Sequence, residues 1–249
     1  NIYHYYIIYK AHVSDASTQE VRDLIRLVRP TTVFVELDSA RAAQLRNSAP
    51  KNDDNADITT PFDISSITSH PLFSGTAARL PGNFTQILES APSLLKRIGW
   101  FPQQGGEMKA ALEEADKFGA RCVYGDIEFG QTINGMKGAL GSYLTNPSQL
   151  ANIQYPSGEL MGIFGGLLSG QKDPKQIVEM IKTRERAIQV TRYLQQSFPS
   201  VYNVMITKRD VHMAKMLRQH CSDGKVVAVV GMAHVEGIER EWEELDSKK

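Results

Sequence analysis

Two histidines stand in nearly the same sequence context at opposite ends of the chain, and a histidine side chain can bind a metal ion. His12 and His234 each follow an apolar run, and each lies in the tripeptide Ala-His-Val. An apolar run that passes through such a tripeptide into a helical pattern is typical of a strand that turns into a helix. Ligands of open α/β sheets bind at the carboxyl ends of the strands. The two imidazoles are therefore placed to meet across one cleft.

Two carboxylates stand at the predicted ends of other strands. Glu36 follows the β-branched run 31–35, and Asp126 follows the run 121–124 after a glycine. A carboxylate beside an apolar strand is costly to bury without a partner, so Glu36 must reach solvent or form an ion pair. Arg41 is one candidate partner, and an ordinary surface salt bridge is the alternative.

Two further charged residues, Arg209 and Asp210, lie next to each other in the segment 199–218, which has a helical pattern. An arginine near a reacting centre can stabilise a developing oxyanion. Charge clusters on helices are more often solvated faces, and that is the structural alternative for this pair.

Two histidines with one or two carboxylates form a donor set for zinc, manganese, cobalt or iron. Such an ion lowers the pKa of its bound water to about 7, which supports hydrolysis at neutral pH. The spacing is not a compact signature such as His-Glu-x-x-His, so the prediction of a metal-assisted hydrolase rests on residue types and predicted strand ends rather than on a motif.

The elements that must position these side chains alternate between strands and helices. Apolar β-branched runs predict strands, and a 3.6-residue pattern predicts helices. The predicted strands are 5–9, 31–37, 121–124 and 226–230, and the predicted helices are 17–28 (opened by a capping box), 84–98, 107–118 (closed by Gly119), 174–196, 199–218 (broken near Thr207) and from Ile238 onward. This order predicts an α/β fold with a central mixed or mostly parallel sheet, flanking helices and a large helical insertion before the last strand.

Composition narrows the class of protein. We expect one domain over 1–249, with a surface loop at 51–70 and the helical insertion at 135–198. The 28 basic residues balance the 28 acidic residues, so the charge gives no support for a nucleic-acid partner. Two cysteines are too few for a disulfide framework, so we expect an intracellular, reducing compartment.

Five short motifs follow one another in a recognisable order. They are YKAHVS at 9–14, VELDSAR at 35–41, GDI at 125–127, KRDVHMA at 208–214 and VGMAHVEGI at 230–238. Together they resemble the TraB family, which includes PrgY-type bacterial pheromone-shutdown proteins and eukaryotic TraB-domain proteins. The resemblance spans nearly the whole chain.

The resemblance implies a function and a set of residues that carry it. The family is similar to erythromycin-esterase-like proteins, ChaN-like proteins and the Tiki proteins, which are proposed metal-dependent peptidases. The implied metal ligands, for zinc, manganese or cobalt, are His12, His234 and Glu36, and the implied catalytic residues are Glu36, Arg41, Asp126, Arg209 and Asp210. The resemblance also implies a peptide or protein partner, and it associates eukaryotic members with mitochondrial or other organelle membranes.

Four positions depart from the family pattern beside the predicted cleft. Tyr9 replaces a glycine, Lys10 a threonine, Ile127 an arginine and Lys208 a glutamate. Two added cations and one lost carboxylate disfavour the binding of a metal ion.

Two functions therefore stay open. The first is a metal-dependent, peptidase-like hydrolase of a peptide or another amide or ester. The second is a non-catalytic binding or accessory module of an organellar membrane-associated assembly, with no metal, a cleft that is empty or plugged by Tyr9, and a partner on the apolar segment 160–170. A third idea, an anion binder that uses the extra lysines, has no dedicated phosphate-binding motif.

Overall fold

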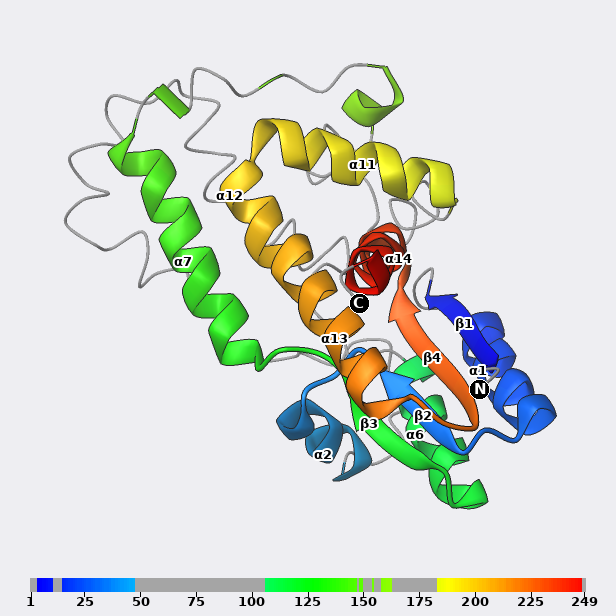
Figure 1. The fold of residues 1–249 in the computed structure, drawn as a ribbon. Coiled ribbons are helices and arrows are strands. Elements are labelled where there is room, and N and C mark those ends of the chain that lie inside the picture. The colour runs from blue at the N-terminus through cyan, green and yellow to red at the C-terminus, as the bar shows by residue number, and fades with distance from the viewer. Residues whose placement is uncertain are drawn as a thin grey trace.

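In the part of the chain that the structure describes, four parallel strands form one sheet (Figure 1). The computed structural model describes residues 4–10, 15–47, 106–146, 148–149, 154, 158–162 and 183–247. The strands are β1 (His4–Lys10), β2 (Thr32–Val35), β3 (Arg121–Tyr124) and β4 (Lys225–Gly231), in the spatial order β1-β4-β2-β3. The last strand in the chain therefore lies between the first and the second, and the carboxyl ends of all four meet at one edge.

The strands are apolar on both faces because helices cover both sides of the sheet. Val33 and Val35 of β2 pack into one core cluster, whereas Phe34 packs into the other. Strand β4 divides in the same way, with Val227 and Val229 on one side and Ala228 on the other. Successive side chains of a strand point to opposite faces, so each strand contributes to both cores.

One face of the sheet is covered by α1 (Asp15–Val28), α2 (Ser39–Asn47) and α6 (Gly106–Phe118). Val21, Ile25 and Val28 form the buried stripe of α1. The predicted capping box at the start of this helix is wrong, because α1 begins at Asp15 and Ser17 lies inside its first turn. The Ser17 hydroxyl instead donates a hydrogen bond to Glu107 of α6 over 2.8 Å.

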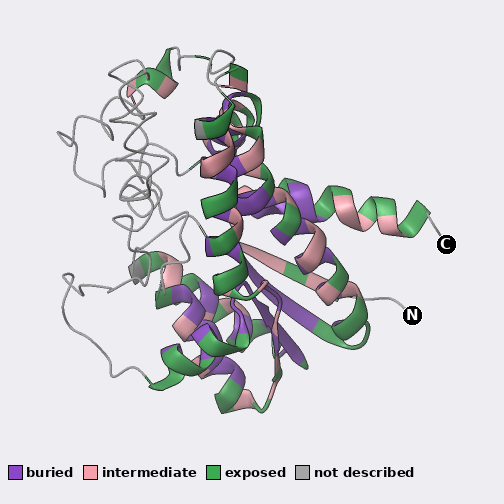
Figure 2. Ribbon diagram, turned by 90° about the vertical axis from the view of Figure 1, so that its left-hand side faces the viewer, coloured by how far each residue is buried: buried purple, intermediate pink, exposed green. Residues whose placement is uncertain are grey.

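The opposite face is covered by α13 (Lys208–His220) and α14 (Met232–Ser247). The predicted helix from Ile238 begins six residues earlier, at Met232, directly after β4. His234 therefore lies in the first turn of α14. The second half of α14 extends away from the body of the molecule toward the C-terminus (Figure 2).

A helical region precedes β4 in the chain, as the sequence predicts. Its described helices are α7 (Phe129–Thr145), α11 (Arg184–Ser197) and α12 (Pro199–Tyr202), followed by a π-helical turn at Asn203–Thr207. This turn accounts for the predicted break near Thr207, because π-helical bulges interrupt the regular hydrogen-bond pattern of a helix. Helix α7 starts before the predicted insertion boundary at residue 135.

The predicted α/β class is confirmed, with a sheet that is wholly parallel over its described strands. Strand β3 and the glycine that ends α6 agree with the sequence patterns, since Gly119 has a φ of 67°. The predicted loop at 51–70 and helix at 84–98 lie outside the described residues. Within the described ranges, no helix is both long enough and apolar enough to cross a membrane.

Candidate functional site

Six of the seven predicted site residues gather at the carboxyl edge of the sheet, and all six are buried. Glu36 directly follows β2, Asp126 closely follows β3, and His234 closely follows β4. The others begin α13 or lie in α2. The six are Glu36, Arg41, Asp126, Arg209, Asp210 and His234. The seventh, His12, lies outside the described residues.

Arg209 is the centre of this group. Its Nε and Nη2 atoms donate to the two carboxylate oxygens of Asp126 over 2.9 and 2.8 Å. Nη2 also donates to Glu36 Oε1 over 2.5 Å, and Nη1 donates to the carbonyl of Met205 over 3.2 Å. Every nitrogen of this guanidinium is thus engaged by the protein. The partner of Glu36 is Arg209, and not Arg41 as the sequence proximity suggested.

Arg41 pairs with two other carboxylates. Its Nε donates to Asp38 Oδ2 over 2.6 Å, and its Nη2 donates to Asp126 Oδ2 over 2.7 Å. Asp126 therefore receives hydrogen bonds from both arginines. The surface salt bridge weighed for Arg41 is ruled out, because only 7% of this residue is exposed.

Asp38 is a site residue that the sequence analysis did not select. It immediately precedes α2 and accepts the backbone N–H of Arg41 over 2.8 Å, which is the role of an N-cap aspartate. It also accepts the backbone N–H of Phe129 at the start of α7 over 3.0 Å. The sequence signal that could have identified Asp38 is an aspartate directly before the residues that form α2, three residues ahead of an arginine.

His234 is held between two carboxylates. Its Nδ1 lies 2.6 Å from Asp210 Oδ1, and its Nε2 lies 3.4 Å from Glu36 Oε1. The other oxygen of Glu36 accepts the backbone N–H of Gly231 over 2.5 Å. Gly237 lets α14 approach Asp210 closely, since a Cβ there would lie 1.7 Å from Asp210 Oδ2.

The pKa values follow from burial and from these neighbours. Burial and Arg209 act to lower the pKa of His234, but Glu36 and Asp210 outweigh them and raise it to about 9. Burial acts to raise the pKa of Asp126, yet Arg209 and Arg41 hold it below its usual value. Burial raises the pKa of Asp210, and its hydrogen bond to His234 only partly offsets this.

The buried group contains more carboxylates than arginines. The carboxylates are Glu36, Asp38, Asp126 and Asp210, and the arginines are Arg41 and Arg209. Counted over the described residues, these four carboxylates and two arginines sum to a formal charge of −2, or −1 when His234 is protonated. Uncompensated buried charge is strongly unfavourable. A proton on His234 or a bound cation reduces this excess.

The donor chemistry fits the divalent metal that the family resemblance implies. Zinc holds nitrogen and oxygen ligands at about 2.0–2.2 Å in a tetrahedral arrangement, which separates the ligand atoms by about 3.4 Å. His234 Nε2 and Glu36 Oε1 are 3.4 Å apart. A metal-binding histidine also usually donates its other N–H to a carboxylate, and Asp210 occupies that position. The described side chains include no complete group of three ligands, and His12, the third predicted ligand, lies outside them.

Two of the four departures from the family pattern fall on described side chains. Lys208 is exposed, so its ammonium is solvated rather than buried with the charged group. Ile127 is half-buried, and its backbone N–H donates to Asp126 Oδ1 over 2.9 Å. The side chains of Tyr9 and Lys10 lie outside the described set.

Comparison with known proteins decides the family. The TraB/PrgY/gumN family matches residues 6–249, which is nearly the whole chain. The chain belongs to this family. The charged group at the sheet edge is thus built from the same segments as the TraB motifs at 35–41, 125–127, 208–214 and 230–238.

Individual relatives of this TraB domain are distant and span the archaea and the animals. An uncharacterized protein of Methanocaldococcus jannaschii is 28% identical over 97% of this chain and 54% of its own length. TraB domain-containing proteins of Homo sapiens and Bos taurus are 27% and 28% identical over 95% of this chain and 62% of their own length. The chain therefore spans about half to three-fifths of these relatives.

Proposed function

We propose that this TraB domain is a metal-dependent, peptidase-like hydrolase of an amide or ester bond. The observation that carries the proposal is the placement of His234. Its Nδ1 is fixed by Asp210, and its Nε2 is left facing Glu36 at 3.4 Å. A carboxylate on one nitrogen of an imidazole is the usual support for a metal ion bound at the other nitrogen, and Glu36 is close enough to that other nitrogen to share the ion.

Each residue has a role in this proposal. His234 and Glu36, together with His12, would hold the ion, and Asp210 orients the imidazole. A bound divalent ion supplies a water of lowered pKa and polarises a carbonyl oxygen. Arg209 fixes the positions of Glu36 and Asp126, and its charge holds the pKa of Asp126 below the usual value. All its nitrogens donate to these carboxylates or to Met205, so none is left to bind a substrate.

Arg41 is better placed than Arg209 to stabilise negative charge on a substrate. Its Nη1 atom is buried and has no hydrogen-bond partner among the described residues, whereas its other side-chain nitrogens bind Asp38 and Asp126. A preorganised donor of this kind lowers the energy of a developing oxyanion.

Metal analysis of the purified protein tests the proposal. We expect near-stoichiometric zinc, manganese or cobalt in the wild-type protein, measured by mass spectrometry after dialysis, and loss of the ion in His234→Ala and His12→Ala. His220→Ala is the matched control, because His220 is exposed on α13 outside the charged group. A metal-loaded sample should then hydrolyse members of a fluorogenic peptide and ester panel.

A non-catalytic binding or accessory module is the second candidate, as a part of an organellar membrane-associated assembly. It is favoured by the pairing of Glu36 and Asp126 with arginines, which stabilises the group in the absence of an ion. No bound metal above background, even after loading with zinc, manganese and cobalt, would reject the hydrolase and favour this module.

A further inference from the structure

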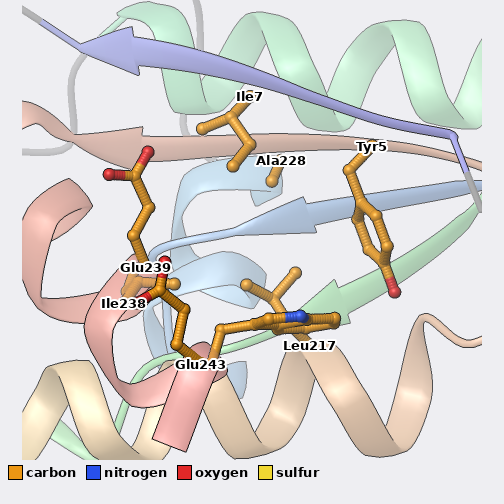
Figure 3. Close-up of a pocket in the computed structure, with 8 residues that line it drawn as sticks. Tyr5, Ile7, Leu217, Ala228, Ile238, Glu239 and Glu243 are labelled. Atoms are coloured by element: carbon orange, nitrogen blue, oxygen red, sulfur yellow. The ribbon is translucent and has the colours of Figure 1, made fainter. Parts of the chain in front are cut away.

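A separate apolar pocket lies between the edge of the sheet and the two helices α13 and α14 (Figure 3). Its volume is about 250 Å³. The pocket is lined by Tyr5, Ile7, Leu217, Ala228, Ile238, Glu239, Trp242 and Glu243. The walls are thus aliphatic and aromatic, apart from two carboxylates.

The two carboxylates lie on one side of the pocket. Glu239 and Glu243 are four residues apart on α14, which places them on the same face of the helix. Figure 3 shows both side chains at the opposite end of the pocket from Tyr5. Both glutamates are exposed, and they lie at the mouth of an apolar cavity.

The rest of α14 strengthens this negative field. The helix carries six acidic side chains and one arginine. A cation that lies between Glu239 and Glu243 is attracted by both carboxylates. The electrostatic preference of the mouth is therefore for a positively charged group.

The size of the pocket favours a side chain over a drug-sized ligand. Sites for small organic ligands usually enclose roughly 300–1,000 Å³, and this pocket is smaller. Strand β1 is the outermost strand at this end of the described sheet, and it forms one wall through Tyr5 and Ile7. A peptide segment that runs along this edge can place one apolar side chain in the pocket.

We propose that this pocket, the α14 pocket, binds a peptide segment in which an apolar side chain lies next to lysine or arginine. The apolar side chain enters between Ile7, Ile238 and Trp242. The neighbouring cation lies between Glu239 and Glu243. The proposal concerns a protein partner and does not depend on metal binding at His234, because none of the pocket residues belongs to the buried charged group.

The test is direct binding of a short fluorescent peptide in which lysine alternates with leucine and phenylalanine. The peptide is titrated with the full chain, and fluorescence anisotropy gives the dissociation constant. Glu243→Lys should weaken binding by about tenfold or more, because it replaces attraction at the mouth by repulsion. Ile7→Trp should weaken binding by filling the pocket. Circular dichroism and thermal unfolding check the fold of each variant.

Glu244→Lys is the matched control. Glu244 is exposed on the same helix, and the substitution changes the net charge as much as Glu243→Lys, but Glu244 does not line the pocket. We expect near wild-type binding for this variant. Equal weakening by both substitutions would overturn the proposal, because it would show attraction by the whole acidic helix rather than binding in the pocket.

Other occupants give different results. Equal binding of a peptide in which glutamate replaces lysine would overturn the proposed charge preference. Binding of octylammonium but not of the basic peptide would show a small-molecule site. A dimer in light scattering that dissociates in Ile7→Trp would show that a second copy of the chain fills the pocket. Either of the last two results, or no binding of the basic peptide, rejects the proposal.

Discussion

Arg209 holds Asp126 through two parallel hydrogen bonds, Nε to Oδ1 at 2.9 Å and Nη2 to Oδ2 at 2.8 Å. A guanidinium matches a carboxylate in this paired geometry, which an ammonium cannot reproduce. The same Nη2 also reaches Glu36. One side chain from α13 therefore joins the carboxylates that follow β2 and β3.

Removal of Arg209 should strongly destabilise the fold. Arg209→Met removes the guanidinium that the buried carboxylates Glu36 and Asp126 share, and we expect a loss of about 3–5 kcal/mol in the free energy of unfolding, measured by urea denaturation. Lys208→Ala is the control, because this neighbour is exposed and should change stability by less than about 0.5 kcal/mol. A loss below about 1 kcal/mol in Arg209→Met would show that the pair is not a source of stability.

Asp210 should control metal affinity through His234. Asp210→Asn has nearly the same shape but cannot stabilise the Nδ1–H tautomer as a carboxylate does. Loss of such a supporting carboxylate typically lowers metal affinity by about 10–100-fold. Competition with a chromogenic chelator measures this affinity for zinc or cobalt. Unchanged affinity, in a variant with a normal melting temperature, would contradict the role given to Asp210.

Gly237 should not tolerate even one added methyl group. A Cβ at this position would lie 1.7 Å from Asp210 Oδ2, so Gly237→Ala must displace either α14 or the Asp210 carboxylate. We expect destabilisation by about 1–3 kcal/mol and a weaker Asp210–His234 contact.

Gly138 provides the opposite case for the same substitution. It lies inside α7, and its Cβ would meet no atom within 4 Å. Gly138→Ala should therefore stabilise the protein by up to about 1 kcal/mol, through helix propensity. Equal effects of the two substitutions in thermal unfolding would contradict the close approach at Gly237.

Glu114 should make the fold sensitive to acid. Its hydrogen bond to Arg26, which outweighs the effect of burial, together with bonds to Lys117 and Arg22, lowers its pKa to about 2. The folded-state pKa is below the usual value of 4.5, so this contribution is full above about pH 5 and is lost as the pH falls toward 2.

Chemical denaturation at several pH values measures this contribution. The shift sets an upper bound of about 3 kcal/mol, and solvent screening of Arg26 and Lys117 reduces it. Glu114→Gln should flatten the decline of stability between pH 5 and 2, whereas Glu113→Gln, a change at a more exposed partner of Arg22, should leave most of it. An unchanged pH profile in Glu114→Gln would contradict the assignment.

The sequence by itself determined the elements whose cause is local. The β-branched run before Glu36 formed β2, the segment Arg121–Tyr124 formed β3, and Gly119 ended α6 with a positive φ. These features depend on side-chain pattern and backbone sterics within a few residues. The TraB motifs also identified six site residues whose side chains lie together at the carboxyl edge of the sheet.

Only the tertiary structure decided the partners of those side chains. Glu36 pairs with Arg209, 173 positions away, rather than with the nearby Arg41. Ser17 bonds to Glu107 of another helix instead of capping its own. Such choices depend on which elements the parallel sheet and its helices bring together, and on the cost of leaving a buried charge unpaired. The free-energy cost of an unpaired charge depends on how deeply the folded chain buries it, so a local sequence pattern cannot predict which partner the charge will have.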